Sequence, residues 1–241
     1  MKLAVFNGSP RGKDSNTKVL LTHFINGFMS NDGNSYELSY LVHSKKQGRD
    51  IVFFRGADYA IIAFPLYFDS MPANVKTFIE SLEPLSHRSD NPAIGFIVQS
   101  GFPEPEHSRY VERYLKRFAE RMGCVYKGTV IRGAYEAIRI PPLLDKTLHK
   151  FIIAMGKTFN KGGMGGVTDI KRLNEKFYEL GAAFGKTGEL SKDIIYQLAQ
   201  PEKLSKIDFW LYKLVGEKLY WNNLLKKNNA HDNRFNRPYV H

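Results

Sequence analysis

A ten-residue segment near the N-terminus carries the polar groups most suited to binding an anion. Its sequence is Gly8-Ser9-Pro10-Arg11-Gly12-Lys13-Asp14-Ser15-Asn16-Thr17. Glycines allow the backbone to come close to a ligand, and the hydroxyl and amide side chains offer hydrogen bonds. The positively charged guanidinium of the arginine can bind an anion through two hydrogen bonds at once. The segment joins an apolar stretch to one with helical spacing, and a helix start adds backbone N–H groups and a positive dipole end. We therefore expect it to bind a phosphate-like group.

The spacing within this segment excludes the best-known phosphate loops. A Walker loop has four residues between its glycines and then Lys-Ser or Lys-Thr, whereas Gly8 and Gly12 enclose three and Asp14 follows Lys13. The dinucleotide fingerprint G-x-G-x-x-G is absent, and the segment contains no cysteine that could act as a phosphatase nucleophile. An ordinary capped turn between a strand and a helix remains the alternative, because serine, threonine and asparagine are common at helix starts.

Strand-like and helix-like stretches alternate over the first two thirds of the chain. Strands are expected at residues 2–6, 36–42, 58–64, 93–99 and 124–132, and amphipathic helices at 15–29, 72–83 and 106–122. The stretch 58–64 is almost entirely apolar, as in a parallel strand that is covered on both faces. The pattern predicts an α/β fold with a doubly wound five-stranded parallel sheet. The carboxyl ends of such strands share one edge, where ligands bind.

The pattern becomes purely helical after Pro141-Pro142. Helices are expected at 147–160, from Thr168 to residue 185, from Ser191 to Pro201, and over 203–227. We favour 168–185 as the helix that follows the fifth strand. The sequence thus predicts one domain over residues 1–190 and a C-terminal helical extension over 191–241. The last helix is basic and amphipathic, with tryptophans. We expect it to pack on the domain or a partner subunit; the alternatives are a lid over the site or contact with a membrane or nucleic acid.

The composition limits the class of protein. The chain has 241 residues, a formal net charge of +11 and 43% apolar residues, which is the balance of a globular domain. No apolar run approaches the roughly 20 residues that span a bilayer, and the first residues do not form a secretory signal. A single cysteine, Cys124, cannot form an intrachain disulfide, and no histidines stand at metal-binding spacing. We expect a cytoplasmic protein without a metal site or membrane insertion.

Three loops, taken in order, resemble those of a known family. Gly8-Ser9-Pro10-Arg11, three residues and then Ser15-Asn16-Thr17 is similar to the phosphate loop of the NADPH-dependent FMN reductases, in the flavodoxin-like superfamily. The stretch Pro65-Leu66-Tyr67-Phe68-Asp69-Ser70-Met71-Pro72 is similar to the family's second loop, and Gln99-Ser100-Gly101-Phe102-Pro103-Glu104 to its third. The loops follow the first, third and fourth expected strands, and the resemblance covers about residues 1 to 190.

This resemblance implies a flavodoxin-like fold that uses FMN as cofactor and NAD(P)H as co-substrate. It implies that the FMN phosphate binds to Ser9, Arg11, Ser15, Asn16 and Thr17. It further implies that the isoalloxazine ring lies beside Pro65, Leu66, Tyr67 and Phe68, with backbone N–H groups of Ser100, Gly101, Phe102 and Glu104 at its pyrimidine edge. The cofactor carries the hydride chemistry, so we expect no catalytic side chain. Family members usually form homodimers, and we expect the same here.

One branch of the superfamily, the iron–sulfur flavoproteins, carries a cysteine motif between the second and third strands. The matching residues here, 42–56, include no cysteine, so no iron–sulfur cluster is expected. The sequence therefore predicts an FMN-dependent oxidoreductase that reduces a small acceptor with NAD(P)H. Candidate acceptors are a quinone, a nitroaromatic, an azo compound, free flavin or another electron carrier.

Two other functions remain open from the sequence. The first is a flavodoxin-type electron carrier without its own substrate, although flavodoxins are typically acidic and use a threonine-rich phosphate loop. The second is a nucleic-acid-binding module on the same fold, which the net charge of +11 would suit. No recognised nucleic-acid motif is present, so no nucleic-acid partner is expected.

Overall fold

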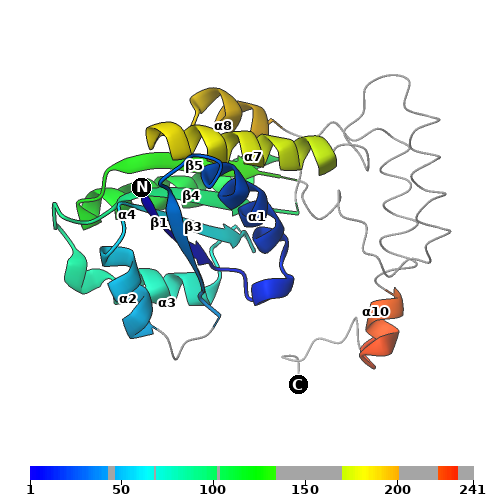
Figure 1. Cartoon of the computed structure of the whole chain (residues 1–241). Coiled ribbons are helices and arrows are strands. Elements are labelled where there is room, and N and C mark those ends of the chain that lie inside the picture. The colour runs from blue at the N-terminus through cyan, green and yellow to red at the C-terminus, as the bar shows by residue number, and fades with distance from the viewer. Residues whose placement is uncertain (43–46, 68, 102–103, 134–169, 201–221, 233–241) are drawn as a thin grey trace. The chain divides into compact units, whose positions relative to one another are not determined.

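The computed structural model describes residues 1–42, 47–67, 69–101, 104–133, 170–200 and 222–232 (Figure 1). The chain divides into two units, one of Met1–Glu136 with Ile170–Glu202 and the other of Ala137–Asp169 with Lys203–His241. Within the second unit, the description covers α10 (Asn222–Lys227) and residues 228–232. The helix expected at 147–160 and most of the one expected at 203–227 lie outside the described residues. The domain boundary at residue 190 stays a prediction.

Five parallel strands form a single sheet in the order β2-β1-β3-β4-β5. They are β1 (Lys2–Asn7), β2 (Ser35–Tyr40), β3 (Tyr59–Pro65), β4 (Ala93–Gln99) and β5 (Tyr126–Arg132). The central strands are buried along nearly their whole length, whereas the edge strand β2 is exposed or half-buried. This order defines the flavodoxin-like α/β fold. The predicted doubly wound sheet of five parallel strands is confirmed.

Helices cover both faces of the sheet (Figure 1). One face carries α2 (Gln47–Arg55), α3 (Ala73–Ser81) and α4 (Arg109–Met122), and the other carries α1 (Asn16–Phe28), α7 (Ile170–Thr187) and α8 (Lys192–Leu198). On the first face, the ring of Phe6 in β1 lies 5.1 Å from Phe53 of α2 and 4.6 Å from Phe78 of α3. None of the helices in the described ranges is long and apolar enough to cross a bilayer.

The helix α2 was not anticipated from the sequence. Its nine residues, Gln47–Arg55, bury Phe53 and Phe54 but also carry Gly48, Arg49 and a buried Asp50. The Asp50 carboxylate accepts a hydrogen bond from the Ser39 hydroxyl at 2.6 Å, which ties α2 to β2. A short helix with so little apolar periodicity forms because the sheet provides a surface for its two phenylalanines.

The helix α7 packs directly on α1. A Cβ atom at Gly181 would lie 1.9 Å from the carbonyl oxygen of Phe24, and one at Gly27 would lie 2.0 Å from a carbonyl oxygen of α7. Only glycine permits this approach of the two backbones. The Asn34 amide adds a hydrogen bond of 2.8 Å to a carbonyl of α7. The expected helix at 168–185 is confirmed from Ile170 and extends to Thr187, whereas residues 168 and 169 lie outside the described residues.

Candidate functional site at the carboxyl edge of the sheet

The strand order reverses between β1 and β3. From β1 the chain moves to β2 on one side, and from β2 it returns to β3 on the other side of β1. Loops that leave neighbouring strands in opposite directions open a crevice at the carboxyl edge, which is where ligands bind in open α/β sheets. The first and second predicted loops follow β1 and β3, and the third follows the adjacent β4. The fold therefore brings all three loops to one edge.

The side chain of Asn7, at the end of β1, organises the first loop. Its Oδ1 accepts a hydrogen bond from Ser9 N at 2.9 Å, and its Nδ2 donates to Ser15 Oγ at 3.3 Å. The Ser15 hydroxyl donates to Gly12 O at 2.7 Å and accepts from Lys18 N at 3.1 Å, so Ser15 caps α1. The loop is therefore ordered by its own hydrogen bonds.

Gly8 fixes this loop between β3 and α3. Its backbone N–H donates to Ala63 O of β3 at 2.7 Å, and its carbonyl accepts from Asn74 Nδ2 at 3.1 Å. A Cβ atom at Gly8 would lie 2.2 Å from Cγ2 of Val75, a buried residue of α3. Any larger residue would displace the loop from the edge of the sheet. The glycine at this position is thus required by packing.

Thr17 provides the observation that points most directly to a ligand. It lies in the first turn of α1 and is 1% exposed, yet its hydroxyl oxygen has no hydrogen-bond partner among the described residues. A buried polar group left unpaired costs about 1–3 kcal/mol, and such groups usually have a partner when the structure is complete. The first N–H groups of a helix also lack intrahelical acceptors and lie at its positive end. This arrangement fits a phosphate.

The five predicted phosphate residues differ in what they can offer. Ser9, Ser15, Asn16 and Thr17 are buried, and Arg11 is exposed on the loop. The hydroxyl proton of Ser15 is used in its bond to Gly12 O, so this side chain has no donor left for a ligand. Ser9 Oγ accepts a hydrogen bond of 3.3 Å from Arg11 N, which leaves its own proton for donation. Ser9, Thr17 and Arg11 are therefore the stronger side-chain candidates.

The second loop is more open than the first. Pro65 and Leu66 are buried, Tyr67 is exposed, and Phe68 lies outside the described residues. Tyr67 and Ser70 exchange two backbone hydrogen bonds of 3.0 Å, which close a tight turn. Within this turn Asp69 has a φ of 59°, in the left-handed region that non-glycine residues rarely adopt. The turn places Tyr67 at the surface of the candidate site.

The third loop is only partly described. Ser100 is buried, and its backbone N–H donates to Arg132 O of β5 at 2.9 Å, so this N–H belongs to the sheet. Gly101 and Glu104 are exposed, whereas Phe102 lies outside the described residues. The prediction that this loop offers N–H groups to a flavin therefore depends on the residues after Ser100.

A histidine joins the second and third loops. His107 belongs to η4 (Pro105–Ser108), and its Nδ1 lies 3.0 Å from Oδ1 of Asp69. Both side chains are partly exposed, so the pair adds little to the free energy of unfolding. The contact links the second loop to η4, which directly follows the third loop.

Three buried polar residues stand at strand ends; the sequence analysis missed Asn7 and Arg132 and named Gln99 in the third loop without giving it a role. Asn7, Gln99 and Arg132 are the last residues of β1, β4 and β5, and each is no more than 6% exposed. Gln99 Oε1 has no hydrogen-bond partner among the described residues. Gln99 and Arg132 are direct neighbours in the register of β4 and β5. A polar residue after a run of apolar strand residues is the signal that could have identified Asn7 and Gln99. Arg132 gives no such signal, because β5 also contains Lys127 and Thr129.

The described residues show neither a metal cluster nor an activated thiol. No group of three or more His, Cys, Asp and Glu side chains among them could hold a metal ion. Burial raises the pKa of the Cys124 thiol to about 12, so this cysteine is not a thiolate nucleophile at neutral pH. Cys124 lies just before β5, at the opposite end of the strand from the candidate site.

Known proteins share the fold of this chain. No protein-family model matches the sequence, and no curated protein matches it. The structure of an FMN-dependent NADH-azoreductase from Bacillus anthracis, in complex with FMN, superposes with a TM-score of 0.51 at 14% identity, covering 77% of this chain and 100% of the other. An NAD(P)H:quinone oxidoreductase from Methanothermobacter marburgensis gives a TM-score of 0.48 at 14% identity, with coverages of 78% and 99%. The similarity to the azoreductase establishes a shared fold.

Proposed function

We propose that this protein is an FMN-dependent oxidoreductase that passes hydride or electrons from NAD(P)H to an acceptor. The observation that carries the proposal is the ordered first loop, where the buried Thr17 hydroxyl lies in the first turn of α1 and has no hydrogen-bond partner in the described part of the chain. This is the β1/β3 switch point, where flavodoxin-like proteins hold FMN. The shared fold with an azoreductase solved in complex with FMN supports the same assignment.

In this proposal the first loop holds the FMN phosphate. The Thr17 and Ser9 hydroxyls would donate hydrogen bonds to phosphate oxygens, and the exposed Arg11 guanidinium would donate charge-assisted, bidentate hydrogen bonds. Asn16 and the first N–H groups of α1 complete the set. Ser15 contributes by capping α1, which keeps those N–H groups in place.

The second and third loops would border the flavin ring. When bound, FMN supplies the hydride and electron transfer itself. Pro65, Leu66, Tyr67 and Phe68 would shield one side of the ring from water, and residues of the third loop would face its polar edge. The contact of 3.0 Å between His107 and Asp69 would keep the two loops at a fixed separation. The homodimer and the small-molecule acceptor are parts of the same proposal.

The test is the visible absorption spectrum of the purified protein, with FMN added if the protein is colourless. The spectrum is then repeated without oxygen after addition of NADPH or NADH. Bound-flavin bands that bleach with a nicotinamide support the reductase. Bound flavin that does not bleach would assign the protein to the electron carriers instead. Failure to bind FMN at all would refute the proposal.

A further inference from the structure

The helix α4 carries a row of four arginines on its outer surface. The arginine row comprises Arg109, Arg113, Arg117 and Arg121, spaced four residues apart, so its members lie along one side of the helix over about 18 Å. All four are exposed. The opposite side of α4 is buried through Val111, Leu115, Phe118, Ala119 and Met122. The row therefore faces away from the sheet.

Most of the row forms no ion pair with the described residues. Arg109 pairs with Glu112 at 2.7 Å, but no ion pair forms at Arg113, Arg117 or Arg121 among the described residues. The Arg113 guanidinium lies over the ring of Tyr110, 4.7 Å from its centroid. The guanidinium groups thus remain accessible to an external anion.

This arrangement works against the stability of the helix. Like charges four residues apart destabilise a helix, and the row contains three such pairs in succession. Arg109 lies in the first turn, where the helix dipole disfavours a cation, but it forms an ion pair with Glu112, and Arg121 lies in the last turn, where the dipole favours a cation. The repulsion between successive arginines itself brings α4 no stability, which points to a use of the row in contact with another molecule.

Two exposed tyrosines of α4 indicate the kind of partner. Tyr110 is 70% exposed and Tyr114 is 40% exposed, and tyrosine and arginine are enriched at protein interfaces. No exposed aliphatic residue accompanies them on α4. A small, polar and charged surface is typical of transient electron-transfer complexes, which form by electrostatic steering. A second copy of this chain would present the same positive row and be repelled, so the partner must be acidic.

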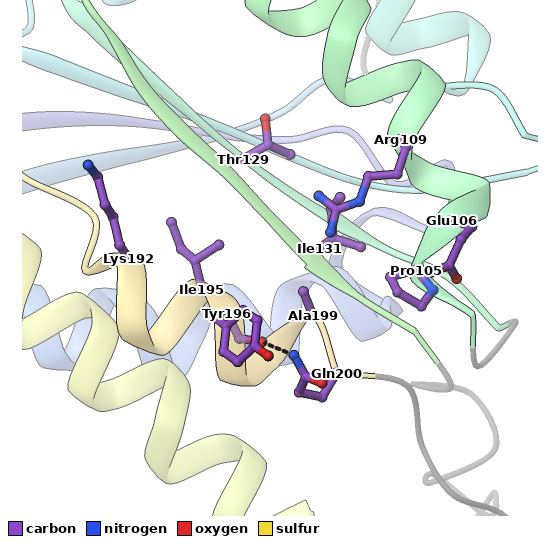
Figure 2. A pocket seen from close by; sticks show the side chains of 10 residues that line it. All are labelled: Pro105, Glu106, Arg109, Thr129, Ile131, Lys192, Ile195, Tyr196, Ala199 and Gln200. Atoms are coloured by element: carbon purple, nitrogen blue, oxygen red, sulfur yellow. Dashed lines mark hydrogen bonds between the residues drawn. The ribbon is translucent and has the colours of Figure 1, made fainter.

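The arginine row begins next to the candidate site. Arg109 directly follows η4, whose His107 contacts the second loop. Arg109 also lines a hollow of about 360 Å³ between α4 and α8, together with Pro105 and Tyr196 (Figure 2). An acidic protein held on the row would therefore extend toward the carboxyl edge of the sheet.

We propose that the arginine row is the docking surface for an acidic one-electron carrier protein, which accepts electrons in addition to the small-molecule acceptor. The inference rests on the proposed function and adds a protein acceptor to it. One NAD(P)H gives up a hydride, which is two electrons and a proton. The two electrons reduce two carrier molecules by one electron each, NAD(P)⁺ is formed and one proton is released.

The test measures docking and electron transfer separately, on the protein supplied with FMN. The probes are cytochrome b5 as an acidic carrier and cytochrome c as a basic one. One triple variant carries Arg113→Gln, Arg117→Gln and Arg121→Gln. The control triple carries Lys2→Gln, Lys171→Gln and Lys186→Gln, which removes the same charge from exposed positions on other elements. Surface plasmon resonance measures binding, and haem absorbance measures reduction.

We expect the arginine triple to lose about tenfold or more in affinity for cytochrome b5 and in its rate of reduction at low ionic strength, and the lysine triple less than about threefold. Salt of about 0.5 M should remove the difference, because it screens the charges. Bleaching of the flavin by NAD(P)H should be the same in both triples and in the wild type. Reduction of a quinone should also be unchanged.

Three results would overturn the inference. Equal losses of affinity and rate in both triple variants would show that only the net charge of the protein matters. Faster reduction of cytochrome c than of cytochrome b5 would exclude an acidic acceptor. Tighter binding of a single-stranded oligonucleotide than of cytochrome b5, lost in the arginine triple, would assign the row to nucleic acid. Failure of the wild type to bind FMN or to bleach would instead refute the proposed function, while the binding assay would still test the row.

Discussion

The loops that leave β1 and β3 meet at the same edge but are held in different ways. The first is buried over much of its length and is ordered by hydrogen bonds from Asn7 and Ser15. The second is exposed, closed by one backbone turn, and joined to the third loop by the contact between Asp69 and His107. A rigid loop suits a group of constant shape, such as a phosphate, whereas an open loop can adjust to acceptors that vary. The following experiments test this division.

The largest effect is expected from Gly8→Ala, which would displace the first loop. The new Cβ would lie 2.2 Å from Val75 Cγ2 and 3.1 Å from Phe64 Cβ. We expect the free energy of unfolding to fall by about 1–3 kcal/mol through overpacking, with a loss of FMN affinity. Urea unfolding and FMN titration measure the two effects. Gly48→Ala is the control, because a Cβ there meets nothing within 4 Å. A Gly8→Ala protein that matches this control in both assays would contradict the fixed loop.

Thr17→Val should change stability and FMN affinity in opposite directions. Valine keeps the shape but removes the buried hydroxyl, so the FMN-free protein should become about 1 kcal/mol more stable. Binding of FMN should weaken by about tenfold or more, because a hydrogen bond to a charged group is lost. Thermal unfolding without FMN and fluorescence titration with FMN test the pair of effects.

Ser15→Ala is the matched comparison for Thr17→Val within the same loop. Loss of the N-cap should lower the free energy of unfolding by about 1 kcal/mol. If Thr17→Val instead lowered stability and left FMN affinity unchanged, the hydroxyl would not be a phosphate ligand.

The smallest effect is expected in the second loop. His107→Ala removes a partly exposed contact, so stability should change by less than about 1 kcal/mol. We expect the KM for the acceptor to rise about two- to threefold, while FMN affinity stays constant. Asp69→Asn should have less effect, because asparagine tolerates the left-handed backbone and can still hydrogen-bond to His107. Loss of FMN affinity in His107→Ala would show that the two loops do not have separate tasks.

The sheet was predictable because parallel strands covered on both faces leave a clear pattern. The run Ala60 to Phe64 is apolar at every position, and it is fully buried in β3. The helix α2 was not predictable, because its residues show little periodicity and its two phenylalanines matter only once the sheet exists. The edge strand β2 was found, but it ends at Tyr40 rather than at Val42.

The site was less predictable than the fold. The sequence indicates which residue types lie in the first loop, but not which hydroxyl is already engaged. The sequence does not distinguish the hydroxyls of Ser15 and Thr17. The structure shows that Ser15 caps α1, while Thr17 Oγ1 has no partner among the residues that the structure describes. Asn7 was overlooked because a polar residue at a strand end normally reaches solvent, whereas here it is fully buried.

The close packing of α7 on α1 has a consequence for synthesis of the chain on the ribosome. The hydrogen bond between Asn34 and Gly185 joins residues 151 positions apart. At about 5–20 residues per second, the ribosome needs roughly 8–30 s to make that stretch. Until then Phe24 and Phe28 lack Phe184, the α7 ring against which they pack. The nascent chain must therefore carry an uncovered apolar face on α1 until α7 has been made, and the sheet domain closes only after that.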